Sequence, residues 1–146
     1  MRILIDTNIL IDSLLGREPF SSDADRLVKL CADKKVDGYI AAHSISNMFY
    51  ILRNKYSPDD RRAILLNLCQ ILKVEGIDEG KIMAGLCNSN FKDFEDCLQY
   101  ECAAALGVKY IITRNSRDFS GCNVSVKSGG GWSTAEKYEI ILPGRT

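Results

Sequence analysis

Acidic residues stand where apolar segments of the chain end. Asp6 closes an apolar run over residues 2–6, Asp93 and Asp96 open a helical pattern, and Asp118 lies five residues beyond the apolar segment 108–113. Ligands of open parallel sheets bind beyond the carboxyl ends of the strands, where these residues are expected. Carboxylates gathered at one sheet edge repel one another, and a hard divalent cation relieves that repulsion. The pattern therefore predicts an all-oxygen site for Mg²⁺ or Mn²⁺.

Each of these acids also has a purely structural interpretation. The side chain of Asp6 can cap the following helix through the backbone N–H of Asn8 or Ile9. Asp93, followed by an acidic residue three positions later, has the pattern of a helix N-cap. Asp118 can pair with Arg114 or Arg117 as an ordinary loop residue. Taken singly, none of the acids decides between a catalytic and a structural role.

Other chemistries find little support in the residues. His43 is the only histidine, which makes a histidine base or a zinc site a poor expectation, and it is placed as a helix-start residue. No two of the six cysteines have the C-x-x-C spacing, so we expect six reduced thiols, most of them in the core. The sequence has no glycine-rich phosphate loop.

Size and composition indicate one ordinary globular domain. The chain has 146 residues, and its 19 basic and 19 acidic residues give a net charge of zero, which argues against binding nucleic acid or membranes by bulk charge. No apolar run approaches the roughly 20 residues that span a bilayer. Because a charge follows the N-terminus at once, no signal peptide is expected, and we predict a cytoplasmic protein without membrane contact.

Strand patterns alternate with helical patterns along the chain, which predicts an α/β fold with a mostly parallel sheet covered on both sides. Strands are expected at residues 2–6, 38–42, 73–77, 108–113 and 124–126, and helices at 8–15, 21–34, 43–52, 58–72, 78–87 and 93–106. The helix 58–72 is expected to bury Ala63, Leu66 and Cys69. Glycine-rich residues 128–131 suggest a division into a domain at 1–128 and an atypical tail at 129–146, in which residues 138–142 could form an edge strand.

Three segments resemble the motifs of the PIN domain family, which includes the VapC-type toxins of bacterial toxin–antitoxin pairs. The opening motif is matched by residues 3–10 (ILIDTNIL), and the central acidic motif by residues 93–96 (DFED) with the small-residue helix 102–107 (CAAALG). The closing motif is matched by residues 110–119 (YIITRNSRDF). Their order and spacing agree with the family over residues 1 to about 126.

The resemblance implies a three-layer α/β/α sandwich and an endoribonuclease that depends on Mg²⁺ or Mn²⁺. By motif matching, Asp6, Asp96 and Asp118 would be the catalytic residues and hold the metal, directly or through water. The supporting residues would be Thr7, Asn8, Asn47, Asp93, Thr113 and Asn115. The partners implied are an RNA substrate, a cognate antitoxin and a second copy of the chain in a homodimer.

The chain departs from the family pattern at two places. Family members usually carry a glutamate on the helix after the second strand, and Asn47 occupies that position here, which removes one negative charge from the expected site. Residues 129–146 do not resemble the usual end of the family. The first departure leaves open an alternative function, a PIN-like module that binds RNA or protein with weak or no catalysis.

A third hypothesis is a metal phosphohydrolase related to the haloacid dehalogenases, which also open with a strand ending in aspartate. Those enzymes require a second aspartate two residues later, where this chain has Asn8, so the opening motif argues against them. For the RNA, the best candidates for phosphate contacts are Arg114 and Arg117, which flank the predicted metal site. Arg53, Lys55, Arg61 and Arg62 are further candidates, with a solvated surface as the alternative.

Overall fold

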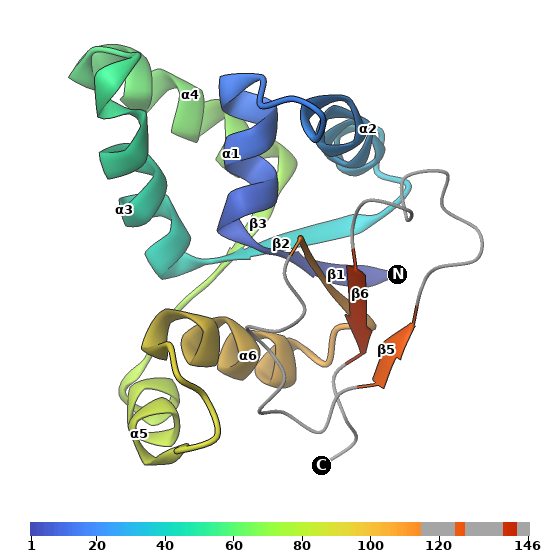
Figure 1. Ribbon diagram of the computed structural model, residues 1–146, viewed down its shortest axis with the longest axis vertical. Helices are drawn as coiled ribbons and strands as arrows, with labels where there is room; N and C mark the ends of the chain where they lie inside the picture. Colours follow the sequence, from blue (N-terminus) through green and yellow to red (C-terminus); the bar gives the residue numbers. More distant parts are fainter. Residues whose placement is uncertain (115–124, 128–138, 143–146) are drawn as a thin grey trace.

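The computed structural model describes residues 1–114, together with the backbone of residues 125–127 and 139–142. The described elements form three layers, in which a twisted sheet separates two groups of helices (Figure 1). This is the α/β/α sandwich that the alternation of strand and helix patterns predicts.

The central sheet has the strand order β3-β2-β1-β4-β6-β5. Four strands are parallel to one another: β1 (Arg2–Ile5), β2 (Asp37–Ala41), β3 (Lys73–Glu75) and β4 (Tyr110–Thr113). The other two, β5 (Ser125–Lys127) and β6 (Glu139–Leu142), are antiparallel. Because β6 lies between β4 and β5, the segment that we expected at an edge belongs to the interior of the sheet, and part of the predicted tail joins the sheet of the main domain.

Six α-helices and one short 3-10 helix surround the sheet in the described residues. On one side lie α1 (Thr7–Leu15), α2 (Ser21–Ala32), α3 (Ala42–Ile51), the 3-10 helix η1 (Leu52–Asn54) and α4 (Pro58–Ile71), and on the other lie α5 (Glu79–Cys87) and α6 (Phe94–Leu106) (Figure 1). Alternate residues of β1 contribute to the hydrophobic cores on the two sides of the sheet. Ile3 and Ile5 belong to the core under α1–α4, and Leu4 belongs to the core under α6.

Local signals placed most helix ends correctly. Ser57 caps α4 by accepting a hydrogen bond from the backbone N–H of Asp60 at 3.1 Å, and Pro58 occupies the first turn. Gly16 and Gly107 end α1 and α6 in the left-handed conformation, with φ of 64° and 60°. At the start of α2, Phe20 holds the cap position and the Ser21 hydroxyl donates to Glu18.

The buried face of α4 differs from the prediction. Leu65 and Leu68 are buried, whereas Leu66 is 65% exposed and Cys69 and Ala63 are exposed. This helix carries two adjacent apolar stripes, so periodicity alone could not select the inward one. The outer stripe forms an apolar groove with α3, lined by Ile45, Phe49 and Leu66.

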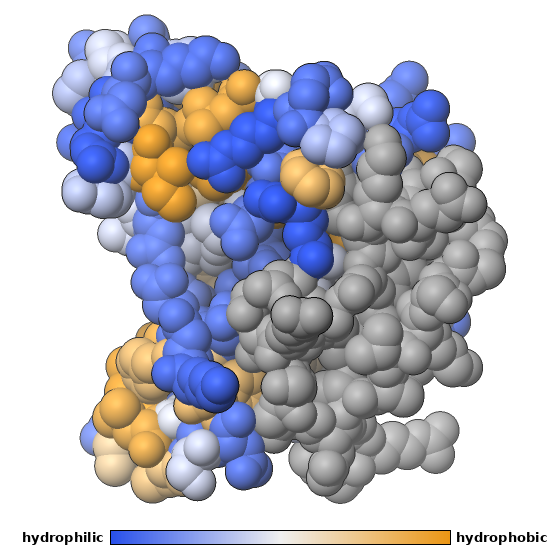
Figure 2. All heavy atoms as spheres, viewed as in Figure 1, coloured by the Kyte–Doolittle hydropathy of each residue, from blue (hydrophilic) through white to orange (hydrophobic). Residues whose placement is uncertain are grey.

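Exposed apolar residues also gather on α5, where Met83 and Leu86 are 54% and 64% exposed, and hydrophobic atoms dominate that part of the surface in Figure 2. Five cysteines in the described residues are free thiols, and burial raises the pKa of Cys31 and of Cys102 to about 11. No helix in the described part of the chain is both long enough and apolar enough to cross a bilayer.

Candidate active site

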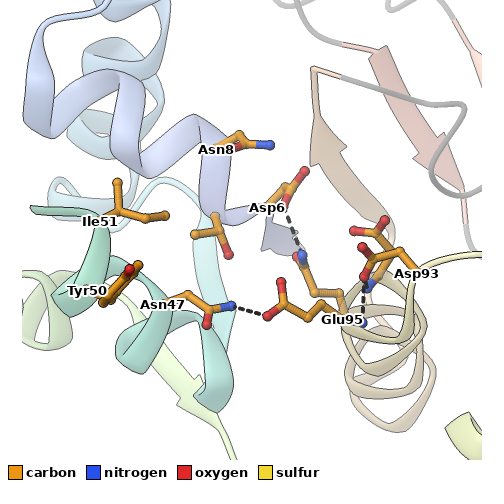
Figure 3. Close-up of a pocket in the computed structure, with 10 residues that line it drawn as sticks. Asp6, Asn8, Asn47, Tyr50, Ile51, Asp93 and Glu95 are labelled. Carbon is orange, nitrogen blue, oxygen red and sulfur yellow. Dashed lines mark hydrogen bonds between the residues drawn. The ribbon is translucent and has the colours of Figure 1, made fainter.

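A cavity of about 430 Å³ opens at the carboxyl end of β1, between α3 and the start of α6 (Figure 3). Carboxylate and amide side chains make up most of its lining, and none of the described lining residues is a lysine or an arginine. The lining residues are Asp6, Thr7, Asn8, Asn47, Tyr50, Ile51, Asp93, Glu95, Asp96 and Gln99. The cavity therefore lies where the sheet topology predicts a ligand site.

Asp6 is the most deeply placed acid of the cavity, with only 3% of its surface exposed. Its backbone N–H continues the sheet by donating to the carbonyl of Ile112 at 2.9 Å. The Oδ1 atom accepts a hydrogen bond from Gln99 Nε2 at 2.9 Å, and Oδ2 accepts one from Thr113 Oγ1 at 2.7 Å. Its side chain makes no capping bond to α1, so the capping interpretation of Asp6 is wrong.

Gln99 places a buried oxygen atom beside the cavity. It is 3% exposed and lines the cavity, and its amide nitrogen donates to Asp6. Its Oε1 atom is buried and has no hydrogen-bond partner within the residues that the structure describes. A buried oxygen without a donor is costly, so it is expected to be satisfied by water or by a cation. Oxygen donors at this place suit Mg²⁺ or Mn²⁺.

The first turn of α6 brings three further acids to the cavity. Asp93 is the N-cap, as its structural interpretation predicted, and its Oδ1 accepts from the backbone N–H of Glu95 at 2.8 Å and of Asp96 at 3.3 Å. This cap fixes the turn on which Glu95 and Asp96 sit, so that both reach the cavity together with Asp93. Asp6 and Asp96, two of the predicted metal-binding residues, are thus brought to one cavity from positions 90 residues apart.

Asn47, on α3, contacts this acidic turn of α6 across the cavity. Its Nδ2 donates a hydrogen bond to Glu95 Oε1 at 2.9 Å, as the dashed line in Figure 3 shows. Four residues earlier on α3, His43 is near the same acids, and burial lowers its pKa, although Glu95, Asp6 and Asp93 oppose the shift. His43 is thus neutral near pH 7 and adds no positive charge to the site.

The opening motif is held by contacts within the core. The hydroxyl of Thr7 donates to the hydroxyl of Ser44 on α3 at 2.7 Å, and both residues are buried. This bond ties the start of α1 to α3. Asn8, the next residue, is exposed and lines the cavity, so its amide faces the site (Figure 3).

Arg114 is engaged by a residue that sequence reasoning did not single out. Its Nε atom lies 2.7 Å from Oδ2 of Asp12, an α1 residue with no exposed surface, and its NH2 group donates to Oδ1 at 3.2 Å. The guanidinium also lies 4.3 Å from the ring centre of Phe20. The guanidinium that was predicted to contact RNA phosphate thus also holds the end of β4 against α1.

Three of the predicted site residues, Asn115, Arg117 and Asp118, lie outside the described residues. Within the described residues, no three His, Cys, Asp or Glu side chains are grouped closely enough to form a ready-made metal site. The described acids share a cavity without converging on one point. Mg²⁺ usually keeps several waters and binds proteins through one or two carboxylates, a mode that such spacing suits.

Several lining residues were not identified from the sequence. Gln99 could have been found, because it lies three residues after Asp96 and so shares its helix face. Tyr50 and Ile51 carry no local signal, since only the packing of α3 brings them to the cavity. Tyr50 is 62% exposed, and the guanidinium of Arg53 lies 3.7 Å from its ring centre.

The other basic residues that were candidates for phosphate contacts lie in different parts of the surface. Arg61 and Arg62 lie over the ring of Phe49, at 4.2 Å and 6.0 Å, beside the apolar groove of α3 and α4. Arg53 differs from them because its aromatic partner, Tyr50, lines the acidic cavity. Among these residues, Arg53 is therefore the better placed to meet a polyanion that enters the cavity.

The chain is similar to known proteins along most of its length. The model of a family described as "PIN domain" matches residues 2–117. The chain is 25% identical over 134 residues to "Ribonuclease VapC1" of Aquifex aeolicus (strain VF5), a match that covers 86% of this chain and 88% of that protein.

Two solved structures share the fold. One, a toxin–antitoxin complex from Klebsiella pneumoniae, aligns with a TM-score of 0.62 and 21% identity over 83% of this chain and 92% of that one. The other is VapBC2 from Rickettsia felis bound to a DNA fragment from its promoter, with a TM-score of 0.57 and 15% identity over 82% and 91% of the two chains.

Proposed function

Because the chain belongs to the PIN domain family, we propose that it is an endoribonuclease that hydrolyses RNA phosphodiester bonds with Mg²⁺ or Mn²⁺. The observation that carries the proposal is Asp6, a buried carboxylate on the wall of an oxygen-lined cavity, whose side-chain partners among the described residues are the neutral donors Gln99 and Thr113. The similarity to a protein named as a ribonuclease supports the same reaction class.

The residues proposed to hold the metal are Asp6, Asp96 and Asp118, with Asp93, Asn8 and Asn115 in support. A divalent cation at such a site neutralises phosphate charge and lowers the pKa of bound water. The protein's own part is to orient the acids: Gln99 and Thr113 hold both oxygens of Asp6, and the Asp93 cap holds the turn that carries Asp96.

Water is proposed as the nucleophile. No Cys, Ser or His is among the described lining residues, and the Thr7 hydroxyl donates to Ser44, so none of these residues offers an activated nucleophile. Direct hydrolysis by water needs no help from the ribose 2′-OH. The products are therefore expected to lack 2′,3′-cyclic phosphate ends.

We further propose that the protein is the toxin of a type II toxin–antitoxin pair. One solved structure with this fold is a toxin–antitoxin complex, another is VapBC2, and a relative in sequence is named VapC1. A cognate antitoxin and a homodimer are the protein partners proposed, and the cytoplasm is the compartment in which such a ribonuclease would meet RNA.

The test is cleavage of a 5′-labelled structured RNA with Mn²⁺, with Mg²⁺ and with excess EDTA. We expect cleavage with either metal and none with EDTA, with the products analysed for cyclic phosphate. Cleavage that survives EDTA would contradict metal dependence. RNA binding without cleavage in either metal would support the alternative function instead, a binding module without catalysis.

A further inference from the structure

Glu95 and Asn47 meet across the acidic cavity from two helices that are far apart in sequence. Glu95 is the second residue of α6, Asn47 lies in the middle of α3, and the amide Nδ2 donates to the carboxylate Oε1 at 2.9 Å (Figure 3). Both line the cavity that contains Asp6 and Asp96. The hydrogen bond uses one oxygen of Glu95 and leaves the other as a further acceptor.

An acid in the first turn of a helix often has only a local role, because it interacts favourably with the helix dipole. That role does not explain the direction of the Glu95 side chain, which reaches across to α3. None of the ion pairs in the described residues involves Glu95, and no lysine or arginine is among the described lining residues. Asn47 therefore orients this carboxylate without neutralising it.

The surroundings of Glu95 favour the binding of a cation. Four carboxylates, Asp6, Asp93, Glu95 and Asp96, line one cavity of about 430 Å³. Independently of these acids, Gln99 lines the same cavity, and its buried Oε1 has no hydrogen-bond partner among the described residues. A cation with its bound waters would neutralise the excess negative charge and would also give the Gln99 oxygen a partner.

We propose that Glu95 is a further carboxylate of the cation site, held in place by the Asn47 amide, so that α6 supplies the charge that the neutral residue at position 47 does not. This inference rests on the proposed metal-dependent function and names a residue that the motif matching left out. Glu95 contacts the cation or its waters through the oxygen that Asn47 does not occupy.

The first test is Mn²⁺ binding to the metal-free protein, measured by calorimetry for Glu95→Gln. The glutamine keeps an oxygen to accept the Asn47 hydrogen bond but removes the charge, so we expect the Kd for Mn²⁺ to rise about tenfold. Glu101→Gln is the matched control, because it removes the same charge from the same helix at a residue that does not line the cavity. The control is expected to change the Kd by less than about twofold.

The second test moves the carboxylate to the other helix. The exchange variant Asn47→Glu with Glu95→Gln conserves net charge, and we expect it to bind Mn²⁺ within about threefold of the parent, because the two positions face the same point. The rise in Tm on adding Mn²⁺ should follow the same order: parent and exchange variant high, Glu95→Gln low. The Tm of each metal-free variant verifies folding.

The outcomes separate this inference from the proposed function. If Asp6→Asn weakens Mn²⁺ binding but Glu95→Gln behaves like Glu101→Gln, the role of Glu95 is wrong and the site stands. If Asp6→Asn leaves Mn²⁺ binding intact, the metal site itself is wrong. An exchange variant that folds but binds as weakly as Glu95→Gln would contradict a shared point for positions 47 and 95.

Discussion

Asp6 and Asp12 are both buried carboxylates, six residues apart at the start of the chain, yet their partners differ in kind. Asp12 has no exposed surface and faces the guanidinium of Arg114 at 2.7 Å, with Arg17 at 4.0 Å. Asp6 is 3% exposed and has two neutral partners, the Gln99 amide and the Thr113 hydroxyl. No ion pair within residues 1–114 includes Asp6.

The difference separates a structural acid from an acid available to a ligand. The charge of Asp12 is already met by cations of the protein, which connect α1 to the end of β4. The charge of Asp6 is oriented by hydrogen bonds but is not neutralised by any residue in the part of the chain that the structure describes, and it borders a cavity with three other carboxylates. Burial alone therefore does not distinguish these two acids, whereas the kind of partner does.

The largest effect is expected for Asp6→Asn. RNA cleavage should fall by at least about 1000-fold, because a divalent cation contributes several kcal/mol to such a reaction and the substitution removes the deepest of the carboxylates proposed to hold it. The fold should tolerate the change, since the new amide can donate to the Oε1 of Gln99, which has no partner among the described residues, while its oxygen accepts from Thr113. Thermal melts and single-turnover cleavage measure the two effects.

Asp12→Asn is the matched control for that variant, because it makes the same change at a buried position of the same segment. It should keep Mn²⁺ affinity within about twofold, since the charge it removes is paired within the protein. Equal loss of Mn²⁺ binding in both variants would remove the distinction between the two acids.

The next largest effect concerns the partner of Asp12. Arg114→Ala should lower the free energy of unfolding by about 3 kcal/mol, because it leaves a buried carboxylate without its closest cation. Arg17→Ala, at 4.0 Å from the same carboxylate and with 42% of its side chain exposed, should change stability by less than about 0.5 kcal/mol.

Replacing both members of the pair tests the explanation. The variant Asp12→Leu with Arg114→Met should regain stability to within about 1 kcal/mol of the parent, because apolar residues of similar size remove the unpaired charge. Urea unfolding curves measure all three variants. A double variant as unstable as Arg114→Ala would show that the arginine acts through packing rather than charge.

A smaller effect is expected at the hydroxyl that orients Asp6. Thr113→Val keeps the shape of a residue with no exposed surface and removes its hydrogen bond to a carboxylate, which should lower the free energy of unfolding by about 1.5 kcal/mol. Thr7→Val removes a bond between two neutral hydroxyls and should lower it by about 1 kcal/mol. A Thr113→Val variant with parent stability would contradict the role given to its hydroxyl.

The smallest effect is the pH dependence of Asp12. Burial raises its pKa above the ordinary 3.8, and Arg114 and Arg17 oppose the shift. A folded-state pKa above the unfolded-state value means that this carboxyl's stabilising contribution is complete below 3.8 and is lost as pH rises through the folded-state pKa. The unfolding free energy of the parent relative to Asp12→Asn should therefore fall with rising pH, as urea curves at several pH values will show. A relative stability that grows with pH would contradict a raised pKa.

Much of the fold follows from local sequence. The apolar run before Asp6, the Ser57–Pro58 cap and the glycines at 16 and 107 placed β1, α1, α4 and α6 close to their observed bounds, because caps and left-handed glycines act within a few residues. The inward face of α4 did not follow, because two apolar stripes satisfy the same helical period. Only contact with the rest of the core selects Leu65 and Leu68 over Leu66.

The candidate site likewise has a part that the sequence predicted and a part that only the tertiary structure showed. Sequence alone identified Asp6, Asp93 and Asp96, since each stands at the end of a strand or the start of a helix, and it identified Asn47 as a neutral residue where a charge was expected. Only the tertiary structure showed that Asp12 pairs with Arg114 and that Asp6 accepts hydrogen bonds from Gln99 and Thr113. The same holds for the hydrogen bond from Asn47 to Glu95. These pairs join residues 48 to 107 positions apart, and nothing local in a sequence encodes which distant group a buried carboxylate will meet.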